Sequence, residues 1–268
     1  MNLLYNRRRN STPALKRHYN HLMPQALTNF RWYLPANASA HGTTLDQHLL
    51  INLWIALGLL ALAHLLLFAG IALRRRNLGS RHKLLLEYLP LAAIVVLYAT
   101  LGVRSEILWA AQRFTGAAPE AMQVEVTGMQ FAWYFRYPGP DATFGQTKPS
   151  LISPAEANPL GLDKSDPHAA DDFVTGQLVL PVDREIDLTL HAQDVIHGFS
   201  VPELRLKQNA VPGQDAHIHF TATQPGDYAI LCTQVCGSGH YRMNATLRVL
   251  PQRQFEQWLL QHENGAKP

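Results

Sequence analysis

Four potential metal ligands lie within 12 residues of one another late in the sequence. In the segment CTQVCGSGHYRM they are Cys232, Cys236, His240 and Met243. Thiolate and thioether sulfurs are soft ligands and imidazole is intermediate, a set that suits copper far better than magnesium or calcium. Zinc is the main competitor, but a structural zinc site normally takes four Cys or His ligands and seldom a methionine. The spacing predicts a metal-binding loop, with copper favoured over zinc.

The number of cysteines bears on the kind of copper site. A mononuclear blue-copper site uses one cysteine, two histidines and an axial methionine, whereas this loop offers Cys232 and Cys236. Two thiolates can bridge two copper ions, each of which then needs an imidazole, and the second imidazole must come from elsewhere. His197 in DVIHGFSVP is the candidate, because it comes just after a predicted strand, Glu185 to Leu190, where the end of a loop can face the cysteines. The alternative for the two cysteines is a simple disulfide in place of a metal site. Asp194, close to His197, could orient the ligand loop, contact a basic donor protein, or simply be solvated.

The elements that must position these ligands are short β-strands. From Gln123 on, short runs of β-branched and aromatic residues are bounded by Pro and Gly, as is typical of strands. Runs of this kind with no helix between them predict a sandwich or barrel. They cover 123–127, 131–137, 177–180, 185–190, 217–221, 228–231 and 246–250. The Pro- and Gly-rich segment 138–172 is expected to be a long surface loop, and 255–262 a short helix.

Two apolar segments precede the strands. Leu49 to Leu73 has 25 residues without an acidic or basic side chain, and Leu84 to Val103 has 20 with one charge, Glu87. Since a bilayer core needs about 20 residues, both are predicted to be transmembrane helices. The basic residues between them are Arg74, Arg75, Arg76, Arg81 and Lys83. They predict a cytoplasmic loop, which places both ends of the chain outside, in the periplasm if the host is a bacterium.

Charged residues make up only 16% of the chain and are unevenly divided. Residues 1–103 carry 11 basic and 2 acidic side chains, and the remainder carries 12 basic and 18 acidic ones. An acidic outer domain argues against nucleic-acid binding and would attract a basic partner. We expect a basic extension at 1–46 that is flexible or processed, a transmembrane hairpin at 47–103, a linker at 104–122, the β-domain at 123–252, and a C-terminal helix and tail at 253–268.

The motifs DVIHGFSVP, KQNAVPG, PGDY and C-x3-C-x3-H-x2-M follow a two-helix hairpin in this order. Over about residues 49–250 the chain resembles cytochrome c oxidase subunit II. The resemblance implies a cupredoxin-like Greek-key barrel that holds the binuclear mixed-valence copper centre, CuA. It implies that Cys232 and Cys236 bridge both coppers, that His197 and Met243 complete one ion, and that His240 and the backbone carbonyl of Gln234 complete the other.

The same resemblance implies a function. Reduced cytochrome c would dock on the acidic outer domain, and the copper centre would pass electrons one at a time to a haem in the membrane-embedded subunit I, where O₂ is reduced by a proton-translocating oxidase. The bacterial inner membrane is the expected location. No C-x-x-C-H motif occurs, so no c-type haem is expected in this chain. A nitric oxide reductase of the same superfamily, or a copper-transfer or structural metal domain, stays open; a quinol oxidase is disfavoured by the copper ligands.

Three positions depart from the family pattern. Gln234 stands where most relatives have a glutamate that helps to bind magnesium at the interface with subunit I, so that magnesium site is doubtful. Phe131 occupies the first tryptophan position of the aromatic segment where electrons enter, and Trp133 follows two residues later. Both are candidates for an electron path, the alternative being packing in the barrel. Glu87 resembles a glutamate at a proton-channel entrance, but its spacing to Pro90 is unusual.

The remaining histidines are expected to be structural. His217 and His219 alternate along a predicted strand and so point to one face, as a metal pair would, but no third ligand is evident in the sequence. The same structural expectation holds for His168, His191 and His262.

Overall fold

The computed structural model describes residues 34–73 and 80–265. The chain divides into two units, Met1–Ala36 and Asn37–Pro268, and nearly all of the first lies outside the described residues. The predicted flexible or processed extension falls largely on residues 1–33, which also lie outside them. From Asn37 on, the chain belongs to the second unit.

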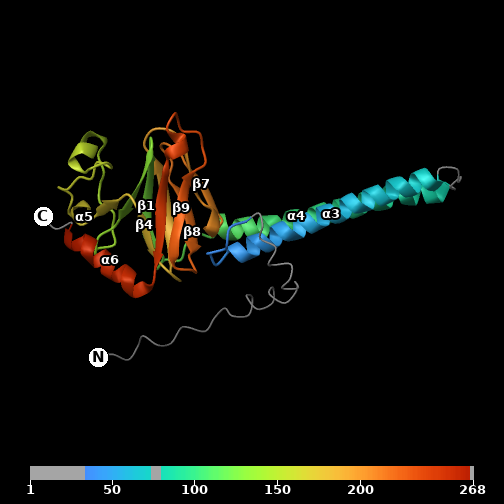
Figure 1. Ribbon diagram of the computed structural model, residues 1–268, viewed down its shortest axis with the longest axis horizontal. Helices are drawn as coiled ribbons and strands as arrows, with labels where there is room; N and C mark the ends of the chain where they lie inside the picture. Colours follow the sequence, from blue (N-terminus) through green and yellow to red (C-terminus); the bar gives the residue numbers. More distant parts are fainter. Residues whose placement is uncertain (1–33, 74–79, 266–268) are drawn as a thin grey trace, which may run out of the picture. The chain divides into compact units, whose positions relative to one another are not determined.

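Two long helices precede the β-domain (Figure 1). Helix α3 spans Gly42–Leu73 and helix α4 spans Ser80–Arg113; each holds a window apolar enough to cross a membrane, with none of that window buried inside the protein. A helix suits such a segment because it satisfies its own backbone groups. We predicted a linker from residue 104, but α4 continues to Arg113, because RSEILWAAQR contains good helix formers and neither Gly nor Pro. The predicted basic loop falls partly on residues 74–79, outside the described residues.

The rest of the chain forms two five-stranded sheets, which share one hydrophobic core. One has the order β3-β2-β1-β5-β8 and the other β4-β10-β9-β6-β7. The strands are β1 Met122–Met129, β2 Ala132–Tyr137, β3 Phe173–Thr175, β4 Leu178–Pro181, β5 Glu185–Ala192, β6 His197–Val201, β7 Leu206–Ala210, β8 Ala216–Thr221, β9 Gly226–Cys232 and β10 Asn244–Leu250. The predicted fold class, two apolar helices followed by an all-β domain, is confirmed.

Three strands were missed by the sequence analysis. β3 has only three residues, and β7, LKQNA, is mostly polar. β6 is buried along its whole length, so it lacks the alternation that marks a half-buried strand. Its pairing with β7 on one side and β9 on the other makes it a strand. This pairing matters for function, because β6 begins at His197.

Alternating side chains from both sheets build the core. Along β5, Ile186, Leu188 and Leu190 are fully buried while the residues between them are partly exposed. Phe199 of β6 and Leu247 of β10 belong to the same buried cluster. Each side chain of this kind contributes about 1.5–3 kcal/mol when removed from water. The core thereby fixes the ends of β6 and β9 relative to each other.

Segment 138–172, predicted as a plain surface loop, has structure of its own. It contains the 3-10 turns η1 Pro149–Leu151 and η2 Pro154–Glu156 and the short helix α5 Pro167–Ala170. Arg136 on β2 anchors this segment: the guanidinium donates to the buried carboxylate of Asp172 and to the carbonyl of Gly145, and Nη1 lies 2.9 Å from Oε2 of Glu125.

Two segments outside the sheets, helix α6 and the chain around the start of α3, make contacts with the β-domain. Helix α6, Gln252–Gly265, is longer than the predicted 255–262 and places Trp258 edge-on to Tyr137, with ring centroids 5.2 Å apart. Ahead of α3, Ser39 forms a β-bridge to Ala222. Asp46 at the start of α3 pairs with Arg205, whose Nε lies 2.7 Å from Oδ1 of the aspartate. This pair ties the first long helix to the β-domain.

Candidate metal centre

The loop that carries the predicted ligands connects two hydrogen-bonded strands. Cys232 is the last residue of β9, and Met243 immediately precedes β10. The two strands pair antiparallel, and the backbone N–H of Cys232 donates to the carbonyl of Met243 at 3.2 Å. The intervening residues therefore leave the sheet and return to it at the same place, with a 3-10 turn, η4 His240–Arg242, on the way back. Sheet pairing alone brings the first and last ligand together.

His197 comes from the neighbouring strand. We predicted it at the end of a loop; it is instead the first residue of β6 and is fully buried. β6 pairs with β9 so that Phe199 lies opposite Cys232, and the N–H of Thr233 donates to the carbonyl of Gly198 at 2.8 Å. The imidazole is thereby held beside the cysteines by backbone hydrogen bonds.

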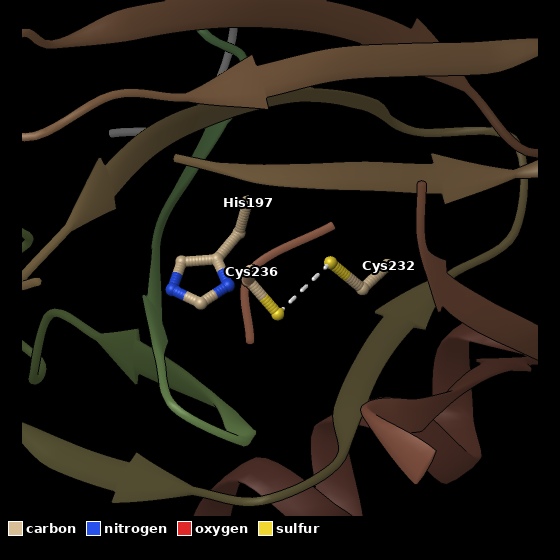
Figure 2. A group of neighbouring side chains, drawn as sticks. All are labelled: His197, Cys232 and Cys236. Carbon is tan, nitrogen blue, oxygen red and sulfur yellow. Dashed lines mark hydrogen bonds between the residues drawn. The ribbon is translucent and has the colours of Figure 1, made fainter. Parts of the chain in front are cut away.

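The structure brings all six predicted residues together. The ligand atoms of His197, Cys232 and Cys236 lie within 4.8 Å of one another, and Figure 2 shows the imidazole beside the two thiols. The two Sγ atoms are 3.9 Å apart. Sγ of Cys236 lies 3.8 Å from Nδ1 of His240 and 3.6 Å from Sδ of Met243, and Sγ of Cys232 lies 3.2 Å from the carbonyl oxygen of Gln234. Both cysteines are free thiols, so the disulfide alternative is not what the structure shows.

Burial keeps the thiol of Cys236 protonated. Cys236 is buried, and burial together with the neighbouring thiol of Cys232 raises the pKa of Cys236 to about 11. A metal ion that binds here must displace thiol protons, since the thiolate is the ligand form. Met243 is also buried, whereas Cys232 and His240 are partly exposed.

Asp194 fixes the orientation of His197. Its Oδ1 lies 2.7 Å from Nε2 of the imidazole. Burial opposes ionisation of Asp194, but hydrogen bonds from His197 and from the backbone N–H groups of Gln130 and Val195 outweigh it and hold the pKa of that carboxyl below its usual value. Nδ1 of His197 is buried without a hydrogen-bond partner. An acceptor nitrogen of this kind beside two thiols is suited to a metal, and a carboxylate on the far nitrogen is a common second partner of such ligands.

Two aromatic rings border the cluster. Trp133 is only 2% exposed and meets the His197 ring edge-on, with centroids 5.8 Å apart. Phe131 is partly exposed and covers the loop at Gly239, where an added Cβ would lie 2.4 Å from its ring. The guanidinium carbon of Arg242 lies 5.8 Å from the centre of the Phe131 ring.

One contributor was missed by sequence reasoning. The side-chain amide of Gln130 donates to the carbonyl of Cys236 at 2.6 Å and so clamps the middle of the loop. The only signal in the sequence was its place next to the aromatic segment. Gln234 points its amide to Oδ1 of Asn209, 3.3 Å away. Glu87 is exposed on α4, and its suggested role stays a prediction.

The histidines expected to be structural have partners outside this cluster. The pairs are His168 with Asp141, His191 with Asp215, His217 with Asp187, His219 with Glu185, and His262 with the carbonyl of Trp258.

Residues 122–250 match the family described as cytochrome c oxidase subunit II, periplasmic domain. The match assigns this part of the chain to the periplasmic domain of the cytochrome c oxidase subunit II family. Two helices that are long and apolar enough to cross a membrane precede this periplasmic domain.

Individual subunit II proteins are similar over part of their length. The chain is 36% identical over 162 residues to the alternative cytochrome c oxidase subunit 2 of Bradyrhizobium diazoefficiens, covering 60% of this chain and 57% of that protein. It is 34% identical over 148 residues to cytochrome c oxidase subunit 2 of Thermostichus vulcanus, covering 55% and 35%. The chain therefore spans only part of the length of these curated relatives. The crystal structure of the periplasmic domain of subunit II of cytochrome oxidase of Bradyrhizobium japonicum has a TM-score of 0.41 and 24% identity, covering 55% of this chain and 97% of that one.

Proposed function

We propose that this chain is the electron-entry subunit of a respiratory haem-copper oxidase in a bacterial inner membrane, and that the loop 232–243 with His197 holds the binuclear CuA centre. The observation that carries the proposal is the convergence of two free thiols, two imidazole nitrogens, a thioether and a carbonyl in one partly buried cluster. The match of residues 122–250 to the periplasmic domain of the subunit II family supports it.

The donor set fits two copper ions. The thiols are 3.9 Å apart, and each has further donors of its own nearby. The unpartnered Nδ1 of His197 is the buried nitrogen that a metal would satisfy. We assign Cys232 and Cys236 as bridging ligands, His197 and Met243 to one ion, and His240 with the carbonyl of Gln234 to the other.

When bound, the copper pair supplies a one-electron relay. The part played by the chain itself is to keep the ligands in place in both redox states, because a preorganised ligand shell lowers the cost of each electron transfer. Three paired strands, β6, β9 and β10, hold the two ends of the loop and His197. Asp194 holds the imidazole, and Gln130 holds the carbonyl of Cys236.

The aromatic rings provide a path from the surface to this shell. Trp133 is too buried to touch a protein donor, but its ring contacts that of His197. Phe131 is partly exposed, and its ring packs against the loop at Gly239. We therefore assign Phe131 to the surface step and Trp133 to a buried position beside the ligand.

An apolar surface adjoins the loop, and the outer domain as a whole has an excess of acidic residues. We assign these two features to different partners. An open pocket of about 520 Å³ is lined by Val195, Ile196, Pro212 and Val235 together with Gln234. Val235 is 86% exposed, and exposed apolar surface of this kind marks a protein contact. We assign this surface to the membrane-embedded subunit I, and the acidic surface of the outer domain to a basic cytochrome c-type donor. The amide of Gln234 lacks the charge that a magnesium ligand supplies, so no interface magnesium is proposed.

The test uses the full-length chain in detergent, reconstituted with copper. We expect two coppers per chain and a seven-line electron-spin-resonance spectrum of a mixed-valence pair, lost in Cys236→Ser. One copper with a four-line spectrum, or preferential retention of zinc, would instead point to a copper-transfer or structural domain. Gas consumption by the assembled complex, O₂ or NO, separates an oxidase from a nitric oxide reductase.

A further inference from the structure

The edge strand β8 carries a pair of histidines that the copper centre does not use. His217 and His219 are two residues apart, so their side chains point to the same face of the sheet. Ile218 between them is buried in the core. The two imidazoles therefore lie on the outer face of the sheet β3-β2-β1-β5-β8, whereas the candidate copper ligands come from the other sheet and its loop.

The neighbouring strand β5 supplies acidic side chains beside these histidines, which the sequence alone did not reveal. Glu185 and Asp187 alternate with buried residues, so they too lie on the outer face. The register of β5 and β8 places Asp187 directly opposite His219. Oδ1 of Asp187 also lies 3.3 Å from Nδ1 of His217, and Oε1 of Glu185 lies 3.3 Å from Nδ1 of His219. Asp187 thus has both imidazoles as neighbours.

We propose that His217, His219 and Asp187, the outer-sheet site, bind a divalent transition metal ion of the zinc or copper(II) type, with Glu185 positioning the ring of His219. Imidazole is the common ligand for such ions, and carboxylates complete many of their sites. The two imidazoles and the carboxylate of Asp187 offer three donors to such an ion, and water can complete its coordination shell. The site differs from the copper loop in its chemistry, because it has nitrogen and oxygen donors and no sulfur.

The side chains of this site differ in exposure, so that some are open to an ion in solution and others are shielded from water. The side chain of His217 is 59% exposed and that of Glu185 is 34% exposed, whereas His219 and Asp187 are 18% and 14% exposed. Nε2 of His219 is buried without a hydrogen-bond partner. An ion can therefore approach by way of His217 and be held by the more shielded His219 and Asp187, and binding requires these side chains to rotate until their donor atoms face one point.

A bound ion would join the edge strand β8 to its neighbour β5. β8 ends its sheet, and β5 is the strand next to it. A ligand that binds only the folded form raises the stability of that form. Metal binding at this site should therefore raise the melting temperature of the β-domain.

The test measures zinc binding to the full-length chain carrying Cys232→Ser and Cys236→Ser, which removes the thiol site. We expect one Zn²⁺ per chain by equilibrium dialysis and metal analysis. His217→Gln, and separately Asp187→Asn, should weaken binding at least tenfold and abolish the rise in melting temperature. The matched control is His168→Gln, because His168 is 56% exposed and also pairs with a carboxylate, that of Asp141. It should leave zinc binding unchanged.

Two further measurements separate a failure of this proposal from misfolding of the variants and from a failure of the function proposed above. His217→Gln in the chain with both cysteines should load copper at the loop normally, which shows that the fold is intact. Copper(II) added to the serine variant should give a mononuclear spectrum with imidazole nitrogen splitting that disappears in His219→Gln. If the serine chain binds no Zn²⁺, or if His217→Gln and Asp187→Asn bind it as well as the parent, the four residues are only cross-strand pairs and the proposal is wrong.

Discussion

Oδ1 of Asp194 lies 2.7 Å from Nε2 of His197. Because the pKa of this carboxyl is held below its usual value, Asp194 is an acceptor at neutral pH, and Nε2 must carry the imidazole proton. Nδ1 is then the nitrogen with a free lone pair, and it is the one buried without a partner beside the thiols. Asp194, three positions before His197, thus decides which nitrogen of the imidazole ring can hold a metal.

Asp194→Asn should lower the affinity for copper by about 10- to 100-fold, the usual effect of losing the partner of a ligating histidine. The amide keeps the size of the side chain but removes the charge that stabilises this tautomer. Competition with a chelator of known affinity measures the change. Asp183→Asn, an exposed aspartate in a turn, serves as the matched control and should have no effect. Equal affinities in the two variants would show that Asp194 does not act on His197 in this way.

Copper loading should become more favourable as the pH rises from 6 to 8. The pKa of Cys236 is raised to about 11, so its thiol is protonated throughout this range and the metal must displace the proton. Each proton released makes the apparent affinity about tenfold higher per pH unit. Calorimetry in two buffers of different ionisation enthalpy counts the protons. Cys236→Ser should release fewer; an identical count would contradict the role of this thiol as a ligand.

Phe131→Leu should slow electron entry from a cytochrome c donor at least tenfold while leaving the copper spectrum unchanged. The leucine keeps an apolar cover on the loop but removes the ring. Phe131→Trp restores a ring and should keep a rate close to that of the parent chain. Flash photolysis of a ruthenium-labelled cytochrome bound to the assembled complex measures the step. A normal rate in Phe131→Leu would assign the path elsewhere.

Association with that donor should weaken as salt is added, because the outer part of the chain has an excess of acidic residues. Stopped-flow association rates between low and physiological ionic strength test this expectation. Rates independent of ionic strength would show that the acidic surface does not steer the donor.

Arg136→Leu should destabilise the β-domain by about 3–5 kcal/mol, because it leaves the buried carboxylate of Asp172 without its cation. Segment 138–172 should then become sensitive to limited proteolysis. Arg248→Leu removes an exposed pair with Asp227, which solvent screens, and should change the melting temperature little. Melting of the full chain in detergent, followed by circular dichroism, compares the two. Similar losses in both variants would show that the Arg136 pair is not the anchor of this segment.

Local patterns in the sequence were enough for much of this protein. An uncharged run such as Leu49 to Leu73 can only be a long apolar helix, and the alternation along β5 marks a strand with one buried face. The soft donors of the loop also follow from residue types and spacing, since Cys232 and Met243 are joined by a short connection. These features depend on neighbours in the sequence and are therefore visible in it.

Tertiary structure decided the relationships that depend on strand pairing. β6 lacks a pattern of its own, and only its place between β7 and β9 puts His197 beside the cysteines. The register of β5 against β8 likewise gives His217 and His219 the carboxylate neighbours that the sequence did not show. Such contacts join residues far apart in the chain, and a shift of the register by one residue would turn each side chain to the other face of the sheet. The sequence by itself therefore determined which donors exist, and the hydrogen-bonded register of the folded sheets decided which of them meet.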